Sequence, residues 1–175
     1  MLRMNDCVDV IIPRGGAGLI RRVLETATVP VLETGVGNCH VYLDESANYG
    51  MAEAIVVNAK TQRPSVCNAM ETLLVNSVWA TAHLAKLLAK LHMLGVTIHG
   101  DAQVRAVDKL AVPAGEEDWA SEYLAPELAV KVVDSLEEAM AHIARYGTKH
   151  TEAIVTEDVE NARIFLHTVD AVSYT

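Results

Sequence analysis

The fold class is set by the stretch METLLVNSVWATAHLAKLLAKLHMLGVTIH, residues 70–99, which contains a strand, a long helix and a second strand in succession. Met70 to Val75 is a mostly apolar run of the kind that forms a buried strand. Residues 77–94 are rich in alanine and leucine, which favours a helix, and Gly95 follows at a position where glycine commonly ends one. Val96 to His99 then predicts the next strand. This succession indicates an α/β domain with parallel strands.

The same alternation extends along the chain in both directions. Further strands are expected at residues 8–12, 29–33, 39–43, 128–133, 152–156 and 171–174. Further helices are expected at residues 18–26, 47–60, 102–107, 136–146 and 159–169. Asp44-Glu45-Ser46 is expected to cap the second of these helices, Ser135 to Glu138 is a capping box for the fourth, and 113–121 is expected to be an acidic loop. The sequence therefore predicts one α/β domain over residues 1–175, with a largely parallel open sheet flanked by helices.

Composition narrows the class of protein. About half of the 175 residues are apolar, which excludes a disordered chain. The formal net charge of −9 argues against a nucleic-acid binder or a protein of anionic membranes, and no run reaches transmembrane length. Three widely spaced cysteines fit a reducing compartment better than a disulfide framework. These features predict a soluble, cytoplasmic protein.

Cys67 ends a polar loop that begins near Asn58 and carries cationic residues. Lys60 and Arg63 precede the thiol, and Pro64 breaks the helical pattern before it. Nearby cations lower a thiol pKa and favour the nucleophilic thiolate, whereas apolar burial raises the pKa. From these residues alone, a nucleophile and an incidental thiol are equally open. Cys7 and Cys39 lie within or beside apolar strands, so a structural role is expected for both.

Two glycine-rich turns are further candidate sites. Glu33 ends the expected strand 29–33 before Thr34-Gly35-Val36-Gly37, and ligands of open α/β sheets gather at the carboxyl ends of strands. Glu33 is therefore a candidate general base, although an ordinary turn carboxylate is the simpler interpretation. Residues 14–18, Arg-Gly-Gly-Ala-Gly, open a helix whose amides would suit a phosphate. Their order departs from G-x-G-x-x-G, so a tight turn explains them equally well. The seven histidines show no metal-ligand spacing.

Taken together, several blocks resemble one family over essentially the whole chain. The blocks are 10–21 (VIIPRGGAGLIR), 33–42 (ETGVGNCHVY), 58–68 (NAKTQRPSVCN), 71–75 (ETLLV) and 147–154 (GTKHTEAI). They resemble γ-glutamyl phosphate reductase, also called glutamate-5-semialdehyde dehydrogenase, an enzyme family of proline biosynthesis in the aldehyde dehydrogenase superfamily. The resemblance implies an aldehyde-dehydrogenase-type catalytic domain.

The resemblance assigns roles to particular residues. It implies that Cys67 is the catalytic nucleophile, and that Glu33, 34 positions earlier, is a general base or, in a reductase that must exclude water, an orienting group. It places Glu122 near the nicotinamide ribose of the cofactor. It implies that the nicotinamide end is lined by Arg14, Gly15 and Gly16. Candidate contacts to the substrate's phosphate or carboxylate are Lys60, Arg63, Ser65 and Asn68.

The implied reaction is NADPH-dependent reduction of γ-glutamyl phosphate to glutamate γ-semialdehyde and phosphate, through a thioester on Cys67. The family's N-terminal nucleotide-binding domain and C-terminal segment have no counterpart in these 175 residues. The isolated chain is therefore expected to show little or no turnover. Glutamate 5-kinase and a homo-oligomer are left open as protein partners. Two alternatives also stay open: a non-catalytic interaction or assembly fragment, and the reductase domain of a bifunctional pyrroline-5-carboxylate synthase.

Overall fold

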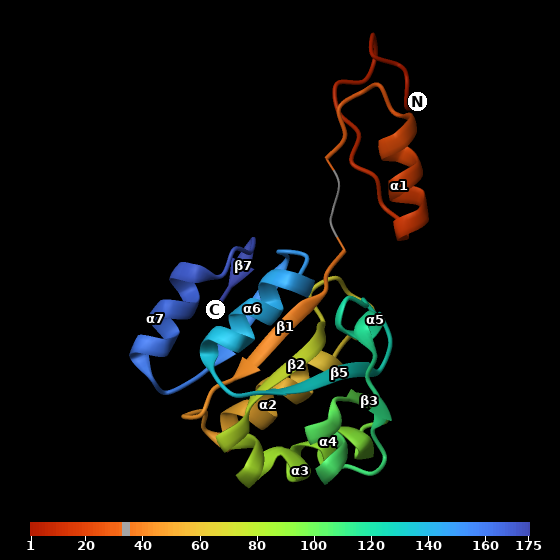
Figure 1. Ribbon diagram of the computed structural model, residues 1–175. Coiled ribbons are helices and arrows are strands. Elements are labelled where there is room, and N and C mark those ends of the chain that lie inside the picture. Colours follow the sequence, from red (N-terminus) through yellow and green to blue (C-terminus); the bar gives the residue numbers. More distant parts are fainter. Residues whose placement is uncertain (33–35) are drawn as a thin grey trace. The chain divides into compact units, whose positions relative to one another are not determined.

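A computed structural model describes residues 1–32 and 36–175 of the chain (Figure 1). The chain divides into two compact units, residues 1–36 and residues 37–175, and each is described by itself. A single catalytic domain over all 175 residues therefore stays a prediction.

The first unit contains one helix, α1 (Ala17–Thr26), close to where the sequence predicts it. The strands predicted at 8–12 and 29–33 are wrong within the described residues, because only one bridge, Ile11 to Val31, joins the two segments. The Ile11 N–H donates to the Pro30 carbonyl and the Leu32 N–H donates to Ile11, both at 2.9 Å. Pro13 and Pro30 have no N–H with which to extend the ladder. Glu33 lies outside the described residues.

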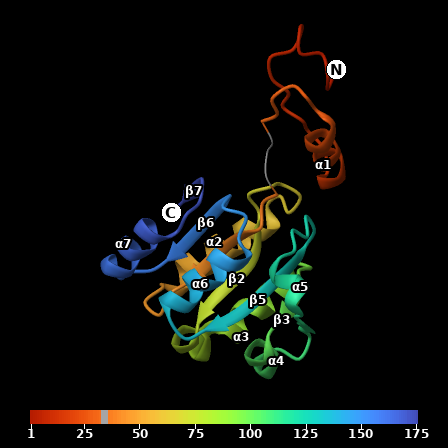
Figure 2. The same cartoon turned by 45° about the horizontal axis from the view of Figure 1, so that its top comes forward.

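The second unit is built on a seven-stranded sheet in which every pairing is parallel, as predicted (Figure 2). Its order is β4-β3-β5-β2-β1-β6-β7. The two longest strands, β2 and β5, are adjacent, and β1 lies on the other side of β2. The strands are β1 (Cys39–Leu43), β2 (Met70–Asn76), β3 (Thr97–Gly100), β4 (Val112–Pro113), β5 (Glu127–Val133), β6 (Thr151–Val155) and β7 (Ser173–Tyr174).

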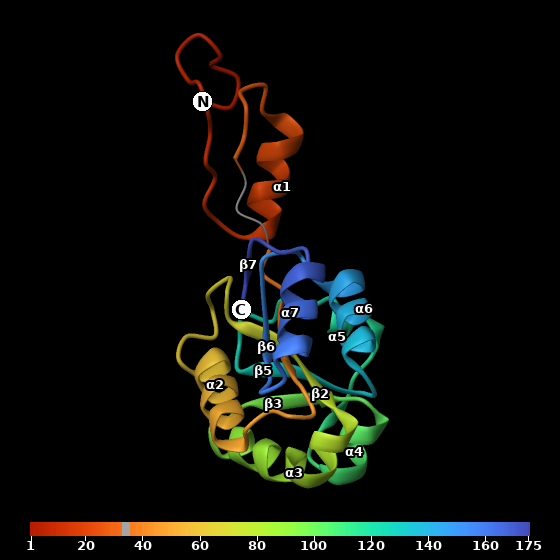
Figure 3. The same ribbon diagram turned by 90° about the vertical axis from the view of Figure 1, so that its left-hand side faces the viewer.

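Helices cover both faces of this sheet (Figure 3). One face packs against α2 (Tyr49–Thr61), α3 (Ser77–Met93) and α4 (Ala102–Val107), and the other against α6 (Leu136–Tyr146) and α7 (Val159–Thr168). Alternating side chains divide the core, since Val41 and Leu43 face the first group of helices and Tyr42 faces the second. In the described part of the chain, no helix has the length and apolar character needed to cross a membrane.

Local differences from the predicted elements have identifiable causes. The N-cap of α2 is Asn48, whose side chain accepts from the Met51 N–H, and not the Asp44-Glu45-Ser46 turn. Asp44 instead accepts a hydrogen bond from the Thr156 hydroxyl at 2.6 Å. The acidic stretch 113–121 contains a short helix, α5 (Glu116–Trp119), in addition to loop. Gly95 has a φ of +80°, which explains why glycine ends α3.

A buried histidine on α6 makes stability depend on pH. His142 packs against Trp119 and Tyr146, and burial, with a smaller effect of His40, lowers its pKa to about 3. Its ordinary pKa is about 6.5. The unfolded chain therefore binds a proton that the folded chain does not between these values. Stability from this residue is full above pH 6.5 and is lost as the pH falls toward 3.

We expect the His142→Phe variant to show a weaker pH dependence of stability between pH 6.5 and pH 4. The wild-type chain should lose up to about 1.4 kcal/mol per pH unit there through this one group. Urea unfolding at several pH values measures the slope. Equal slopes in the two proteins would show that His142 does not titrate as its burial requires. A difference in the free energy of unfolding that is the same at every pH reports the change in packing alone.

Candidate active site

The predicted nucleophile lies at the amino-terminal edge of the parallel sheet. Cys67 precedes β2, Gly37 precedes β1, Glu122 precedes β5 and His150 precedes β6. Since all strands run in the same direction, these segments meet at one edge. The carboxyl-end argument applies to Glu33, which lies outside the described residues, whereas the candidate site residues that the structure describes precede their strands.

The loop of residues 62–69 presents Cys67 on the surface. Two turns shape it, closed by the Val66 N–H to the Arg63 carbonyl at 3.4 Å and the Ala69 N–H to the Val66 carbonyl at 3.0 Å. Cys67 is exposed, and so are Arg63, Ser65 and Asn68. Within the described residues, neither Sγ nor the N–H of Cys67 makes a hydrogen bond to protein. The thiol and an adjacent backbone donor are thus both available.

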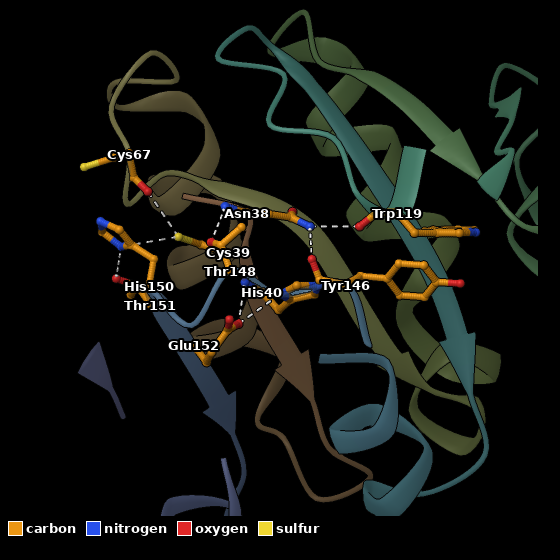
Figure 4. A network of polar contacts seen from close by, with 10 residues as sticks. All are labelled: Asn38, Cys39, His40, Cys67, Trp119, Tyr146, Thr148, His150, Thr151 and Glu152. Atoms are coloured by element: carbon orange, nitrogen blue, oxygen red, sulfur yellow. Dashed lines mark hydrogen bonds and ion pairs between the residues drawn. The ribbon is translucent and has the colours of Figure 1, made fainter. Parts of the chain in front are cut away.

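The backbone of Cys67 is held by the segment that enters β1. Its carbonyl oxygen lies 3.2 Å from the Sγ of Cys39, and its own side chain points away from that contact (Figure 4). Gly37 packs against the same carbonyl so closely that a Cβ at position 37 would overlap the oxygen. We call Gly37, Asn38 and Cys39 the carbonyl seat. Cys39 is buried, as a structural thiol should be, whereas Cys7 is exposed and lies in no strand, so the prediction for Cys7 is wrong.

Asn38 anchors the carbonyl seat to two other parts of the unit. Its side chain is fully buried, and its Nδ2 donates to the Trp119 carbonyl at 2.8 Å and to the Tyr146 carbonyl at 2.9 Å. Its backbone N–H donates to the Thr148 hydroxyl at 3.0 Å. Because carbonyl oxygens only accept, the two side-chain contacts fix which end of the amide is the nitrogen. The seat is therefore tied to α5, α6 and the loop before β6.

Glu122 contacts the carbonyl seat directly. One oxygen of its carboxylate accepts the Gly37 N–H at 2.7 Å. The second oxygen makes no hydrogen bond to protein within the described residues. Glu122, predicted to lie near a nicotinamide ribose, is thereby brought to the segment that holds Cys67.

Lys60 lies in the core and not in the site. Its side chain is fully buried, and its ammonium nitrogen is 2.5 Å from a carboxylate oxygen of Glu71 at the start of β2. The other Glu71 oxygen accepts the Leu124 N–H at 3.2 Å. Burial lowers the pKa of Lys60 and raises that of Glu71, and the charge of each opposes the shift of the other. Lys60 forms a buried structural ion pair with Glu71 at the base of the Cys67 loop. The prediction that Lys60 contacts the substrate is corrected accordingly.

The remaining predicted site residues belong to the first unit or lie outside the residues that the structure describes. Arg14, Gly15 and Gly16 precede α1 and are exposed, so their role at the nicotinamide end stays a prediction. Glu33 lies outside the described residues. Among the residues that the structure does describe, no cluster of three or more histidine, cysteine or acidic side chains is arranged to hold a metal ion.

The contact between Gly37 and the Cys67 carbonyl leads to a direct test. We expect Gly37→Ala to lower the free energy of unfolding by about 1–3 kcal/mol, because the added methyl group overlaps a backbone atom that cannot rotate away. Urea unfolding measures the change. Gly50→Ala, on α2 with only an ordinary contact at 3.4 Å, is the matched control and should be neutral or slightly stabilising. A neutral Gly37→Ala would mean that the seat and the Cys67 carbonyl are not in contact.

Comparison with solved structures first defines the class of fold. Lactaldehyde dehydrogenase from Escherichia coli superposes on 97% of this chain with a TM-score of 0.80, using 46% of its own chain, at 17% sequence identity. At that identity the likeness establishes the fold, which is that of part of an aldehyde dehydrogenase. No family model matches the chain.

Similarities at higher sequence identity are to the γ-glutamyl phosphate reductases. γ-Glutamyl phosphate reductase from Halalkalibacterium halodurans is 59% identical over 173 residues, which are 99% of this chain and 42% of that protein. The crystal structure of γ-glutamyl phosphate reductase from Thermotoga maritima matches 99% of this chain with a TM-score of 0.96 at 46% identity, over 42% of its own length. The chain is a homologue of the γ-glutamyl phosphate reductases. It spans about two fifths of the length of these relatives.

Proposed function

We propose that this chain supplies the nucleophile-bearing part of a γ-glutamyl phosphate reductase, which forms glutamate γ-semialdehyde in the cytoplasm. The observation that carries the proposal is Cys67: an exposed thiol on a backbone-held loop, in a chain 59% identical to such a reductase. The substrate, γ-glutamyl phosphate, is an acyl phosphate. Its carbonyl carbon is the electrophile that a thiolate attacks.

The covalent step proceeds through a thioester. The Cys67 thiolate forms a bond to the acyl carbon, the bond from that carbon to the phosphate oxygen breaks, and inorganic phosphate leaves. The Cys67 N–H, which has no acceptor within the described residues, is available to stabilise the oxyanion that develops on the carbonyl oxygen. Arg63, Ser65 and Asn68 are exposed on the same loop and are proposed to contact the phosphate or the α-carboxylate.

NADPH is the proposed cofactor, and when bound it supplies a hydride to the thioester carbon. Glu122 is proposed to hold the nicotinamide ribose of this cofactor. Its second carboxylate oxygen makes no hydrogen bond within the described residues and can accept one from a ribose hydroxyl. Arg14, Gly15 and Gly16 are proposed to line the nicotinamide end. Glu33 is proposed as an orienting group, since a reductase gains nothing from activating water against its own thioester. After reduction, the C–S bond breaks and releases the aldehyde, and Cys67 is regenerated.

The proposal is tested with a chimera in which this chain replaces the matching 42% of the Thermotoga maritima enzyme. We expect the chimera to reduce NADP+ with glutamate γ-semialdehyde only when phosphate is present. The 175-residue chain alone, assayed in parallel, is expected to show little or no turnover. A folded chimera without phosphate-dependent activity contradicts the proposed reaction and favours an interaction domain. Equal alkylation rates for Cys67 and Cys7 in the isolated chain would show that it holds no activated thiol.

A further inference from the structure

Cys39 is a buried thiol to which the proposed reaction gives no role. It begins β1, next to β2, and its Sγ lies 3.2 Å from the carbonyl oxygen of Cys67. The other polar groups near this sulfur are the His150 Nδ1, at 3.9 Å, and the backbone and side chain of Thr151. The His150 nitrogen lies closer to the Thr151 hydroxyl, at 2.8 Å. Among these contacts, the one with the Cys67 carbonyl is the hydrogen bond in which the Cys39 sulfur is the donor.

The direction of this hydrogen bond follows from chemistry. A carbonyl oxygen can only accept a hydrogen bond, so the S–H group of Cys39 must be the donor. Burial, together with the Glu152 carboxylate, raises the pKa of Cys39 to about 12, so the thiol is protonated at neutral pH. The S–H group is thus present whenever the enzyme would be working.

Holding the Cys67 carbonyl restricts the reacting residue itself. The peptide that joins Cys67 to Asn68 is planar, so fixing its C=O direction fixes the torsion that follows the Cys67 Cα. The side chain of Cys67 leaves the same Cα in the opposite direction, away from the sheet (Figure 4). One hydrogen bond to the main chain therefore limits where the thiol is carried without touching the sulfur.

The carbonyl seat is rigid enough to perform this task. The Asn38 side chain donates hydrogen bonds to the carbonyls of Trp119 and Tyr146. The Gly37 N–H donates a hydrogen bond to the Glu122 carboxylate. Cys39 itself belongs to a strand paired on both sides, with β2 and with β6. The donor is thus part of the sheet, whereas the carbonyl belongs to an exposed loop.

We propose that Cys39 is a positioning residue, whose S–H group holds the main chain of Cys67 so that the thiol meets the acyl phosphate in one orientation. The inference rests on the proposed function for its effect on turnover. Its effect on the accessibility and reactivity of the Cys67 thiol is independent of the substrate.

Two substitutions of nearly equal size separate hydrogen bonding from packing. Cys39→Ala removes the donor, whereas Cys39→Ser keeps a hydroxyl donor, and both leave a similar space where sulfur was. Both are made with Cys7→Ser, so that Cys67 is the exposed thiol that remains. Iodoacetamide alkylation of Cys67 is measured against pH in the 175-residue chain. Turnover and KM are measured in the Thermotoga maritima chimera.

We expect Cys39→Ala to change the pH profile of alkylation and to lower kcat by about three- to tenfold with KM nearly unchanged, the range of one lost hydrogen bond. Cys39→Ser should recover most of both. Equal behaviour of the alanine and serine variants in alkylation and in kcat overturns the proposal, and thermal unfolding shows whether either variant is merely less folded. If the chimera is inactive, the proposed function fails, and the alkylation profiles still decide the positioning role.

Discussion

Cys67→Ala in the chimera is expected to reduce phosphate-dependent NADP+ reduction by at least about 10³-fold, because the reaction then lacks the atom that forms the thioester. The loss should appear in kcat, since Arg63, Ser65 and Asn68 remain on the loop to contact the substrate. Initial rates with glutamate γ-semialdehyde and phosphate, followed by the absorbance of NADPH, measure the change.

Two controls make this result specific to Cys67. Cys7→Ser, which removes the other exposed thiol, should leave the rate unchanged. Mass spectrometry after acid quenching should place an acyl adduct on the peptide containing Cys67 in the unsubstituted protein alone. A Cys67→Ala chimera that retains more than a tenth of the rate would rule out a thioester at this residue.

Lys60→Met is expected to lower the free energy of unfolding by about 3–5 kcal/mol. The substitution leaves the Glu71 carboxylate fully buried with the Leu124 N–H as its remaining partner in the described contacts. A buried charge without its counter-ion is costly, whereas an apolar pair of similar volume is not. Urea unfolding of the 175-residue chain measures the change.

The double variant Lys60→Met/Glu71→Leu should regain most of the lost stability, because it removes both charges. Arg163→Ala provides the surface control, since its pair with Glu160 is exposed and screened by water and should contribute little to stability. If Lys60→Met changes stability no more than Arg163→Ala, Lys60 does not form a buried ion pair with Glu71 in solution. Its prediction as a substrate contact would then be restored.

Elements of the second unit were predictable because their signals are local. Ser135 caps α6, Gly95 ends α3, and the strands are apolar runs bounded by polar residues. The two early strands failed because a strand needs a partner along its length, and residues 8–12 have one bridging contact in the described structure. Sequence patterns show what a segment prefers, but they do not show whether a partner extends beside it.

The burial of Lys60 had a signal in the sequence. Glu71 stands in the apolar run from Met70 to Val75, and a carboxylate inside a buried strand needs a counter-ion or hydrogen-bond donors nearby. Lys60, 11 residues earlier, is the partner that this rule would have found. By contrast, the bonds of Asn38 to Trp119 and Tyr146 span 81 and 108 residues, and no local pattern indicates them.

Because Cys67 is anchored through its main chain, the nucleophilic side chain at position 67 can be replaced by another. The loop is held through a main-chain oxygen, while the sulfur makes no hydrogen bond within the described residues. Any residue at position 67 offers the same oxygen to Cys39 and Gly37. Serine or selenocysteine should therefore carry its own reacting atom close to the place where sulfur now lies. Nucleophiles of different strength can be compared at one point in space, with the protein around them unchanged.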